Sequence, residues 1–260
     1  MGHIRKAEEG RSLPKVAAII AVRMASKRFY GKPLATVEGK PILTHLVNIF
    51  KKVSEIDSIM LAISGEKENQ VFVDYAKENG LLYYVDAGHD EEDVLGRLIR
   101  AAEMIKAGHV VRATSEGPIR YNNISEVIKR HVKTSADLTF TEKLPGGTNV
   151  EVIRLSAMKK AYELDRKYHC AMVTLCMNEH PELFKIETIT PPKVVQRPEL
   201  DLDVDTESNL MAVKEIFKKA ERDKNGFVRV ESAIALVDKH PHLKKMLADG
   251  RKALEGRIWG

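Results

Sequence analysis

The sequence has few cysteines and few aromatic residues. Only two of its 260 residues are cysteine, Cys170 and Cys176, and aromatic residues make up 6%. No partner ligands lie near the two cysteines, so we expect reduced thiols rather than a disulfide framework or a cysteine metal site. A basic stripe with interleaved aromatic side chains, typical of nucleic-acid binders, is also not visible. Nucleic acid is therefore not the expected partner.

Long apolar runs and a large excess of one charge are also missing. No run reaches the ~18 apolar residues that a membrane span requires, and residues 1–14 contain no apolar core of a signal peptide. We therefore expect a cytoplasmic protein without a membrane partner, whose residues 1–14 form a flexible arm. The 42 basic and 37 acidic residues give a net charge of +5. This small excess suits an anionic small-molecule substrate.

A buried strand followed by a basic loop is the most informative stretch. Residues 16–22 are apolar and partly β-branched, which is typical of a buried parallel strand. The loop that follows carries four cations and a serine: Arg23, Ser26, Lys27, Arg28 and Lys32. Ligands of open α/β sheets bind outside the carboxyl ends of strands. The strand end at Val22 and this loop are therefore a candidate polyphosphate site, although a solvated basic loop is the alternative.

Apolar patterning along the rest of the chain predicts alternating strands and helices. Further strands are expected over residues 57–64, 81–85, 109–114, 137–140, 150–155, 184–190 and 200–206. Helices are expected over residues 41–53, 67–79, 90–107, 124–134, 156–164, 169–177, 207–220, 230–239 and 242–255. This alternation predicts an α/β fold with a Rossmann-like, doubly wound, mostly parallel sheet.

The basic loop resembles a known signature. Its spacing Arg23-x-x-Ser26-x-Arg28-x-x-x-Lys32-x-Leu34 is similar to the nucleotide-binding loop of the sugar cytidylyltransferases. That family includes the synthetases of CMP-activated 3-deoxy-octulosonate and sialic acids. The resemblance implies that the loop wraps the triphosphate of CTP, with Arg23, Arg28 and Lys32 as the catalytic cations. Tyr30 departs from the family, since many members have proline there.

Two further strings resemble the spore-coat polysaccharide (SpsF-type) branch of this family. They are Asp93-Val94-Leu95-Gly96-Arg97 and Pro145-x-Gly147-x-x-x-Glu151. Arg97 would contact substrate or phosphate, or else form a structural ion pair. Glu151 lies in an apolar run, where a carboxylate needs a salt bridge or a ligand contact. With the nearby Asn149 and Arg120, these residues are candidates for binding the acceptor substrate.

Two acidic positions match the family pattern for a bound magnesium ion. Arg112, Thr114 and Pro118 fit Arg-x-Thr-x-Asp-x-Pro, but Glu116 replaces the aspartate, and its extra methylene moves the carboxylate by about 1.5 Å. The run Asp203-x-Asp205-Thr206 fits the second position, although Asp205 could simply cap the following helix. The resemblance implies that Asp205, Glu116 and Asp203 hold Mg²⁺, with Arg112 and Ser115 beside the nucleotide.

Together these features predict a Mg²⁺-dependent cytidylyltransferase. It would transfer CMP from CTP to a sugar, sugar acid or other small polar acceptor and release pyrophosphate. We expect a nucleotidyltransferase domain over residues 15–225, an acceptor-side excursion over 145–198, a C-terminal helical extension over 226–260, and a possible homodimer. Because Glu116 replaces the family's aspartate, a nucleotide-binding module without catalysis is an alternative. The Asp-x-Asp run keeps open a glycosyltransferase of the same fold.

Overall fold

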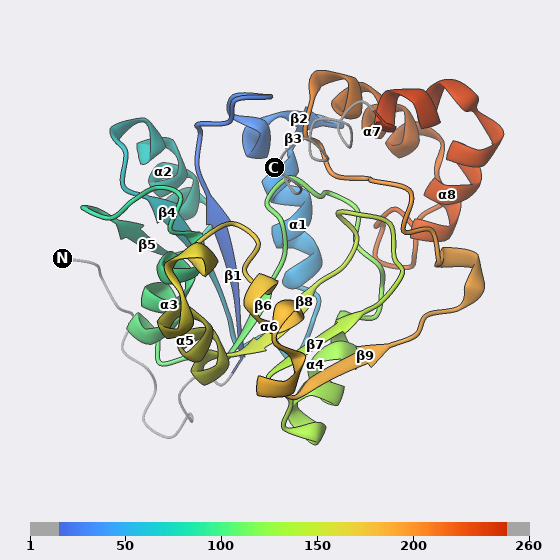
Figure 1. Ribbon diagram of the computed structural model, residues 1–260. Coiled ribbons are helices and arrows are strands. Elements are labelled where there is room, and N and C mark those ends of the chain that lie inside the picture. The colour runs from blue at the N-terminus through green and yellow to red at the C-terminus, as the bar shows by residue number, and fades with distance from the viewer. Residues whose placement is uncertain (1–15, 249–260) are drawn as a thin grey trace.

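The centre of the fold is a seven-stranded sheet (Figure 1), seen in a computed structural model that describes residues 16–248. The strand order is β5-β4-β1-β6-β8-β7-β9. The strands are β1 (Val16–Val22), β4 (Ser58–Ser64), β5 (Leu82–Asp86), β6 (His109–Arg112), β7 (Leu138–Thr141), β8 (Glu151–Arg154) and β9 (Ile186–Ile189). Strand β8 is antiparallel to β6 and β7, and the other pairings are parallel. The predicted mostly parallel α/β sheet is confirmed.

Helices cover both faces of the sheet because side chains of each strand point alternately to its two sides. Ala18, Ile20 and Val22 of β1 pack in one core cluster, and Ala17 and Ile19 pack in another. The first cluster includes residues of α1 (Ile42–Phe50), α2 (Gln70–Glu78) and α4 (Ile124–Thr134). The second includes residues of α3 (Val94–Met104), α5 (Leu155–Leu164) and α6 (Leu175–Glu179). The sheet is therefore doubly wound, as predicted.

A third core cluster joins the last helices to a small hairpin. Helices α7 (Glu207–Lys219) and α8 (Val230–Lys239) lie together on the right of Figure 1. They pack with Val37 of the hairpin β2 (Thr36–Val37) and β3 (Lys40–Pro41). Short 3₁₀ turns are η1 (Lys32–Leu34), η2 (Lys67–Asn69), η3 (Arg166–Tyr168), η4 (Pro181–Leu183) and η5 (Lys193–Val195). Among residues 16–248, no helix combines the length and apolar character needed to cross a bilayer.

Residues 241–248 are helical, as expected for the start of the last predicted helix. The rest of that helix, and the predicted arm over residues 1–14, lie outside the described residues. Two other expectations are wrong. Residues 200–206 form no strand, because their backbone bonds go to single loop residues, including Gly146 and Glu116. The helix expected over 169–177 is confined to α6, and Arg112 instead binds the carbonyl of Ala171.

Strand β1 lies where the order of connections reverses. The chain passes from β1 to β4 and β5 on one side, and then returns to β6 on the other side. Loops that follow β1, β5 and β6 therefore meet beyond the carboxyl ends of these strands. Such a reversal point is where open α/β sheets place their ligands.

Candidate active site

A cavity of about 440 Å³ lies at this reversal point. Its walls come from the loop after β1, the start of α3, and residues 112–116 at the end of β6. The structure brings together every residue that the sequence predicts to bind nucleotide: Val22, Arg23, Ser26, Lys27, Arg28, Lys32, Arg112 and Ser115. The volume is within the range of small-molecule sites.

The basic loop turns back on itself at Gly31. The Gly31 N–H donates to the carbonyl of Met24 over 2.9 Å, and the backbone has φ +66°. A Cβ atom at this position would lie only 2.9 Å from the Met24 methyl carbon, so glycine suits both the conformation and the space. The 3₁₀ turn that starts at Lys32 and contains Pro33 follows at once. Local geometry therefore fixes the direction in which Lys32 leaves the loop.

Asp205 receives two cations of the basic loop. Its Oδ1 atom lies 2.8 Å from Nη2 of Arg28 and 2.7 Å from Nζ of Lys32. Asp205 is buried, with 5% of its surface exposed, so these partners compensate a carboxylate removed from water. The N-cap of α7 is Thr206, whose side chain accepts from Asn209 N–H. Asp205 is thus not the helix cap, and its side chain points to the basic loop instead.

Glu116 lies on the other side of Lys32. Its Oε1 atom is 2.8 Å from Lys32 Nζ, and its Oε2 atom accepts a hydrogen bond from Ser115 over 2.7 Å. Burial alone would raise the pKa of Glu116, but Lys32 and Ser115 hold it below its ordinary value. Burial also opposes the charge on Lys32, yet Glu116 and Asp205 raise its pKa. Lys32 therefore stays charged between the two carboxylates.

Asp203 is half-buried and has other partners than Asp205. Its Oδ1 atom accepts from the Thr114 hydroxyl over 2.9 Å. A Cβ atom added to Gly117 or Gly147 would lie 2.6 or 2.5 Å from this carboxylate oxygen, so the two glycines make room for it. Burial, with the nearby Asp201 and Glu116, raises the pKa of Asp203 to about 7. Burial and the neighbouring carboxylates therefore both disfavour the charged form of Asp203.

The predicted acceptor residues lie outside the lining of this cavity, except for Arg97. Glu151 pairs with Arg112 over 2.8 Å and accepts from Thr174 over 3.0 Å. Because Arg112 and Glu151 are opposite each other in the β6–β8 register, the sheet itself brings them together.

Asn149 and Arg120 support the loops behind the site. Asn149 Oδ1 accepts from Thr141 N–H and Val150 N–H. Arg120 is buried and donates to the carbonyls of Gly147 and Thr114. Burial lowers the pKa of Arg120 to about 10. In this structure both side chains are bound to other parts of the protein.

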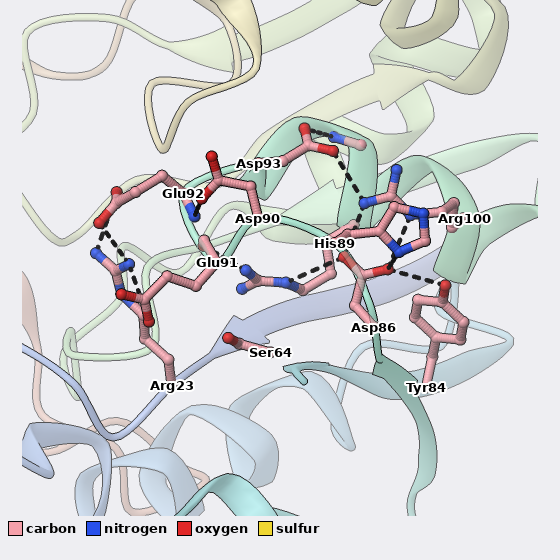
Figure 2. Close-up of polar contacts among 12 residues, drawn as sticks. Arg23, Ser64, Tyr84, Asp86, His89, Asp90, Glu91, Glu92, Asp93 and Arg100 are labelled. Carbon is pink, nitrogen blue, oxygen red and sulfur yellow. Dashed lines mark hydrogen bonds and ion pairs between the residues drawn. The ribbon is translucent and has the colours of Figure 1, made fainter. Parts of the chain in front are cut away.

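Glu91 and Glu92 form a part of the wall that sequence reasoning missed. Arg23 is 2.8 Å from Glu92 Oε1 and 3.8 Å from Glu91 Oε2, as Figure 2 shows. The helix predicted over residues 90–107 places the acidic residues 90–93 at its start. Only Asp93 has that role, since its side chain accepts from Gly96 N–H. This acidic run directly precedes the Asp93–Arg97 string, and that position was the signal that could have placed it at the site.

Comparison with known proteins agrees with this geometry. The sequence model of a family described as cytidylyltransferase matches residues 17–252. The chain belongs to the cytidylyltransferase family. It is therefore a nucleotidyltransferase, and the resemblance seen in the basic loop is confirmed.

Relatives of the cytidylyltransferase chain span nearly its whole length. The uncharacterized protein MJ1063 of Methanocaldococcus jannaschii is 27% identical over 240 residues, which cover 92% of this chain and 96% of the relative. The spore coat polysaccharide biosynthesis protein SpsF of Bacillus subtilis is 24% identical over 231 residues, covering 86% and 94%. A solved cytidylyltransferase of Leptospira borgpetersenii superposes with a TM-score of 0.76 at 20% identity, covering 89% and 97%. The last likeness shows a shared fold.

Proposed function

We propose that this cytidylyltransferase transfers CMP from CTP to a small polar acceptor, with Mg²⁺ as cofactor and pyrophosphate as the second product. One observation carries the proposal. Arg28 and Lys32, two cations of the basic loop, converge on Asp205, and Lys32 also contacts Glu116. A triphosphate with a divalent cation requires this combination of positive side chains and hard carboxylate oxygens at one place.

The residues present fit a magnesium ion. Within residues 16–248, acidic, histidine and cysteine side chains do not form a ready-made group of three around one point. Mg²⁺ in nucleotide sites is commonly held by one or two carboxylates, with phosphate oxygens and water completing the shell. Asp205 and Glu116 would supply the carboxylates, and Asp203 lies behind them. When bound, the ion would neutralise charge that develops on the phosphates.

The side chains around the cavity would act by binding and orientation. A hydroxyl group of the acceptor would give its proton to water, and its oxygen would form a bond to the α-phosphorus of CTP. The bond between the α-phosphorus and the oxygen that bridges to the β-phosphate would break, so that pyrophosphate leaves with that oxygen. Arg23, Arg28 and Lys32 would hold the triphosphate in line and stabilise the charge on the leaving pyrophosphate. This displacement needs no nucleophile from the protein, so the site can consist of cations and carboxylates alone.

The acceptor is proposed to be a sugar, a sugar acid or another polyhydroxylated small molecule. The relative SpsF is named for polysaccharide biosynthesis, which supports this class. Arg112 and Ala171 line the cavity, and Arg112 pairs with Glu151 and donates to the carbonyl of Ala171. Arg112 and Glu151 would contact hydroxyl or carboxyl groups of the acceptor.

The proposed metal role is tested by Asp205→Asn. We expect this variant to lose Mg²⁺-dependent pyrophosphate release, because a neutral amide neither attracts the ion nor compensates Lys32. The assay combines each of the four nucleoside triphosphates with a panel of acceptors and a Mg²⁺ titration. Asp74→Asn, on the exposed side of α2, is the matched control and should behave as the unaltered protein. A fully Mg²⁺-responsive Asp205→Asn protein would place the ion elsewhere.

A further inference from the structure

We propose that Glu91 and Glu92 recognise the base of the nucleotide, by accepting hydrogen bonds from the 4-amino group of cytosine. This inference rests on the proposed function, because it takes the nucleotide to occupy the cavity beyond β1. It goes further by assigning the choice between cytosine and uracil to two named carboxylates.

The cavity has two chemically different sides. Lys32, Glu116 and Asp205 lie on the side of β6. Glu91 and Glu92 come from the loop between β5 and α3, and β5 lies on the opposite side of β1 from β6. A nucleotide with its phosphates at the first side extends its base toward the second side. The base would then lie against the start of α3.

The acidic side matches one pyrimidine and not the other. Cytosine presents an amino group at position 4, followed by acceptors at N3 and O2. Uracil presents a carbonyl oxygen at position 4 and a donor at N3. An ionised carboxylate only accepts hydrogen bonds. Glu91 and Glu92 would therefore bind the cytosine amine and repel the uracil oxygen.

A second observation at the same place comes from Arg97. This side chain lines the cavity and is 1% exposed, and its Nε atom has no hydrogen-bond partner. Its Nη2 atom donates to the carbonyl of Glu91 over 2.5 Å, while Asp86 is 3.7 Å from Nε. A buried donor without a partner is costly. The Nε atom itself is covered and lies near Asp86, so it is the terminal N–H groups of Arg97 that would donate to N3 and O2 of cytosine. Val94 offers an apolar contact for the ring.

The loop that carries the two carboxylates is fastened at both ends, as Figure 2 shows. Arg100 donates to both oxygens of the buried Asp86 over 2.8 and 2.7 Å, and to Asp93 over 3.0 Å. Asp86 ends β5 and Asp93 starts α3, so one guanidinium ties the two ends of the loop together. Residues between them are therefore held in place before a ligand arrives, which lowers the cost of ordering them.

Arg23 connects the base side to the phosphate side. It donates to both oxygens of Glu92 through Nη1 and Nη2. A guanidinium has five N–H donors, so Arg23 can keep these bonds and still donate to a phosphate. The same contact orients Glu92 toward the cavity.

The test is equilibrium binding of CTP and UTP, measured by calorimetry without an acceptor. The unaltered protein should bind CTP at least about tenfold more tightly than UTP. In the double variant Glu91→Gln with Glu92→Gln, the amides can also donate to the uracil oxygen, so the ratio should fall about tenfold. Glu103→Gln, an exposed glutamate near the end of α3, is the control and should keep the original ratio. Thermal melting confirms that each variant is folded.

Two results would overturn the inference. One is an unaltered protein that binds both nucleotides equally well, or binds neither. The other is a double variant that binds both more weakly with an unchanged ratio, which would reduce the carboxylates to partners of Arg23. Binding and turnover are separate readouts. A protein that prefers CTP in a manner dependent on Glu91 and Glu92, but never releases pyrophosphate, would support base recognition and refute the proposed transfer reaction.

Discussion

Lys32 shows how single side chains hold the site together. Its ammonium lies between Glu116 and Asp205, at 2.8 and 2.7 Å, and only 12% of the side chain is exposed. Each carboxylate would be unfavourable in this buried place without the cation. The spacing of the basic loop predicts that Lys32 binds phosphate. The sequence could not show its second role, since the two carboxylates meet it only through the fold.

Replacing Lys32 separates these two roles. In Lys32→Ala we expect pyrophosphate release to fall by about 100-fold or more, as loss of one electrostatic donor typically does. We also expect Mg²⁺ to raise the melting temperature more than in the unaltered protein, because Glu116 and Asp205 then lose the Lys32 ammonium, although Arg28 still contacts Asp205. Steady-state kinetics and melting curves with and without Mg²⁺ measure both effects. Lys40→Ala, in the exposed hairpin, is the control, and near-normal turnover of Lys32→Ala would contradict the role.

At the scale of elements, the start of α7 positions Asp205. Thr206 and Asn209 form a reciprocal capping box, in which each side chain binds the backbone N–H of the other residue. Asn209 Oδ1 also accepts from the N–H of Asp205 over 3.1 Å. The cap therefore fixes the backbone on which the carboxylate is carried. A helix end that satisfies its own N–H groups leaves Asp205 available to Arg28 and Lys32.

Removal of the cap hydroxyl should weaken the fold measurably. In Thr206→Ala we expect the free energy of unfolding to fall by about 1 kcal/mol, the usual cost of losing an N-cap. Urea unfolding followed by circular dichroism measures this change. Thr134→Ala removes an exposed hydroxyl that bonds within the last turn of α4, and should change stability by less than about 0.5 kcal/mol. Equal losses in the two variants would show that the capping box is not significant.

Helices and strands whose apolar residues recur at regular spacing could be predicted from the sequence. Segments whose conformation depends on contacts with residues far away in the sequence could not. Strand β1 and helix α4 have the bounds expected from the sequence, because their burial follows from local patterning. Residues 200–206 alternate like a strand, yet their partners are loop residues more than fifty positions away. Contacts of Arg112 with Ala171 and of Glu151 with Thr174 likewise hold residues 171–174 outside a helix.

At the scale of the whole molecule, a histidine pair joins helix α4 to the central sheet. His131 belongs to α4 and His109 to β6. His131 is fully buried, with Nε2 3.1 Å from Nδ1 of His109 and Nδ1 3.0 Å from the Thr139 hydroxyl. Burial, then the neighbouring His109 and Arg154, lower the pKa of His131 to about 3. Burial and Arg154 also lower the pKa of His109. Both rings are therefore neutral in the folded protein at neutral pH.

Stability should fall as the solution becomes acidic. The unfolded chain binds a proton at His131 near pH 6.5, whereas the folded chain does so only near pH 3. Between pH 6.5 and pH 5 this difference should remove about 1.5 kcal/mol of unfolding free energy. Urea unfolding at both pH values should show a smaller loss in His131→Asn than in the unaltered protein. His240→Asn, outside the sheet, is the control, and identical pH slopes in all three proteins would contradict the assignment.

The parts of the candidate site differ in how well the sequence predicted them. The loop after β1 and Asp205 were predicted through family spacing and lie together in the structure. The mostly parallel sheet followed from alternation and explains why these segments converge. Glu91 and Glu92 were not identified, because their pairing with Arg23 joins positions 69 residues apart for Glu92, and composition alone assigned them to a helix start.

The contacts of Arg28 and Lys32 with Asp205 join positions 177 and 173 residues apart. During synthesis Arg28 and Lys32 therefore leave the ribosome long before Asp205, the carboxylate that neutralises their charges. A nascent chain, or a fragment cut before Asp205, has these guanidinium and ammonium groups without their aspartate counterpart. Synthesis beyond Asp205 is thus a condition for assembling this centre, and chains that end before this residue cannot form it.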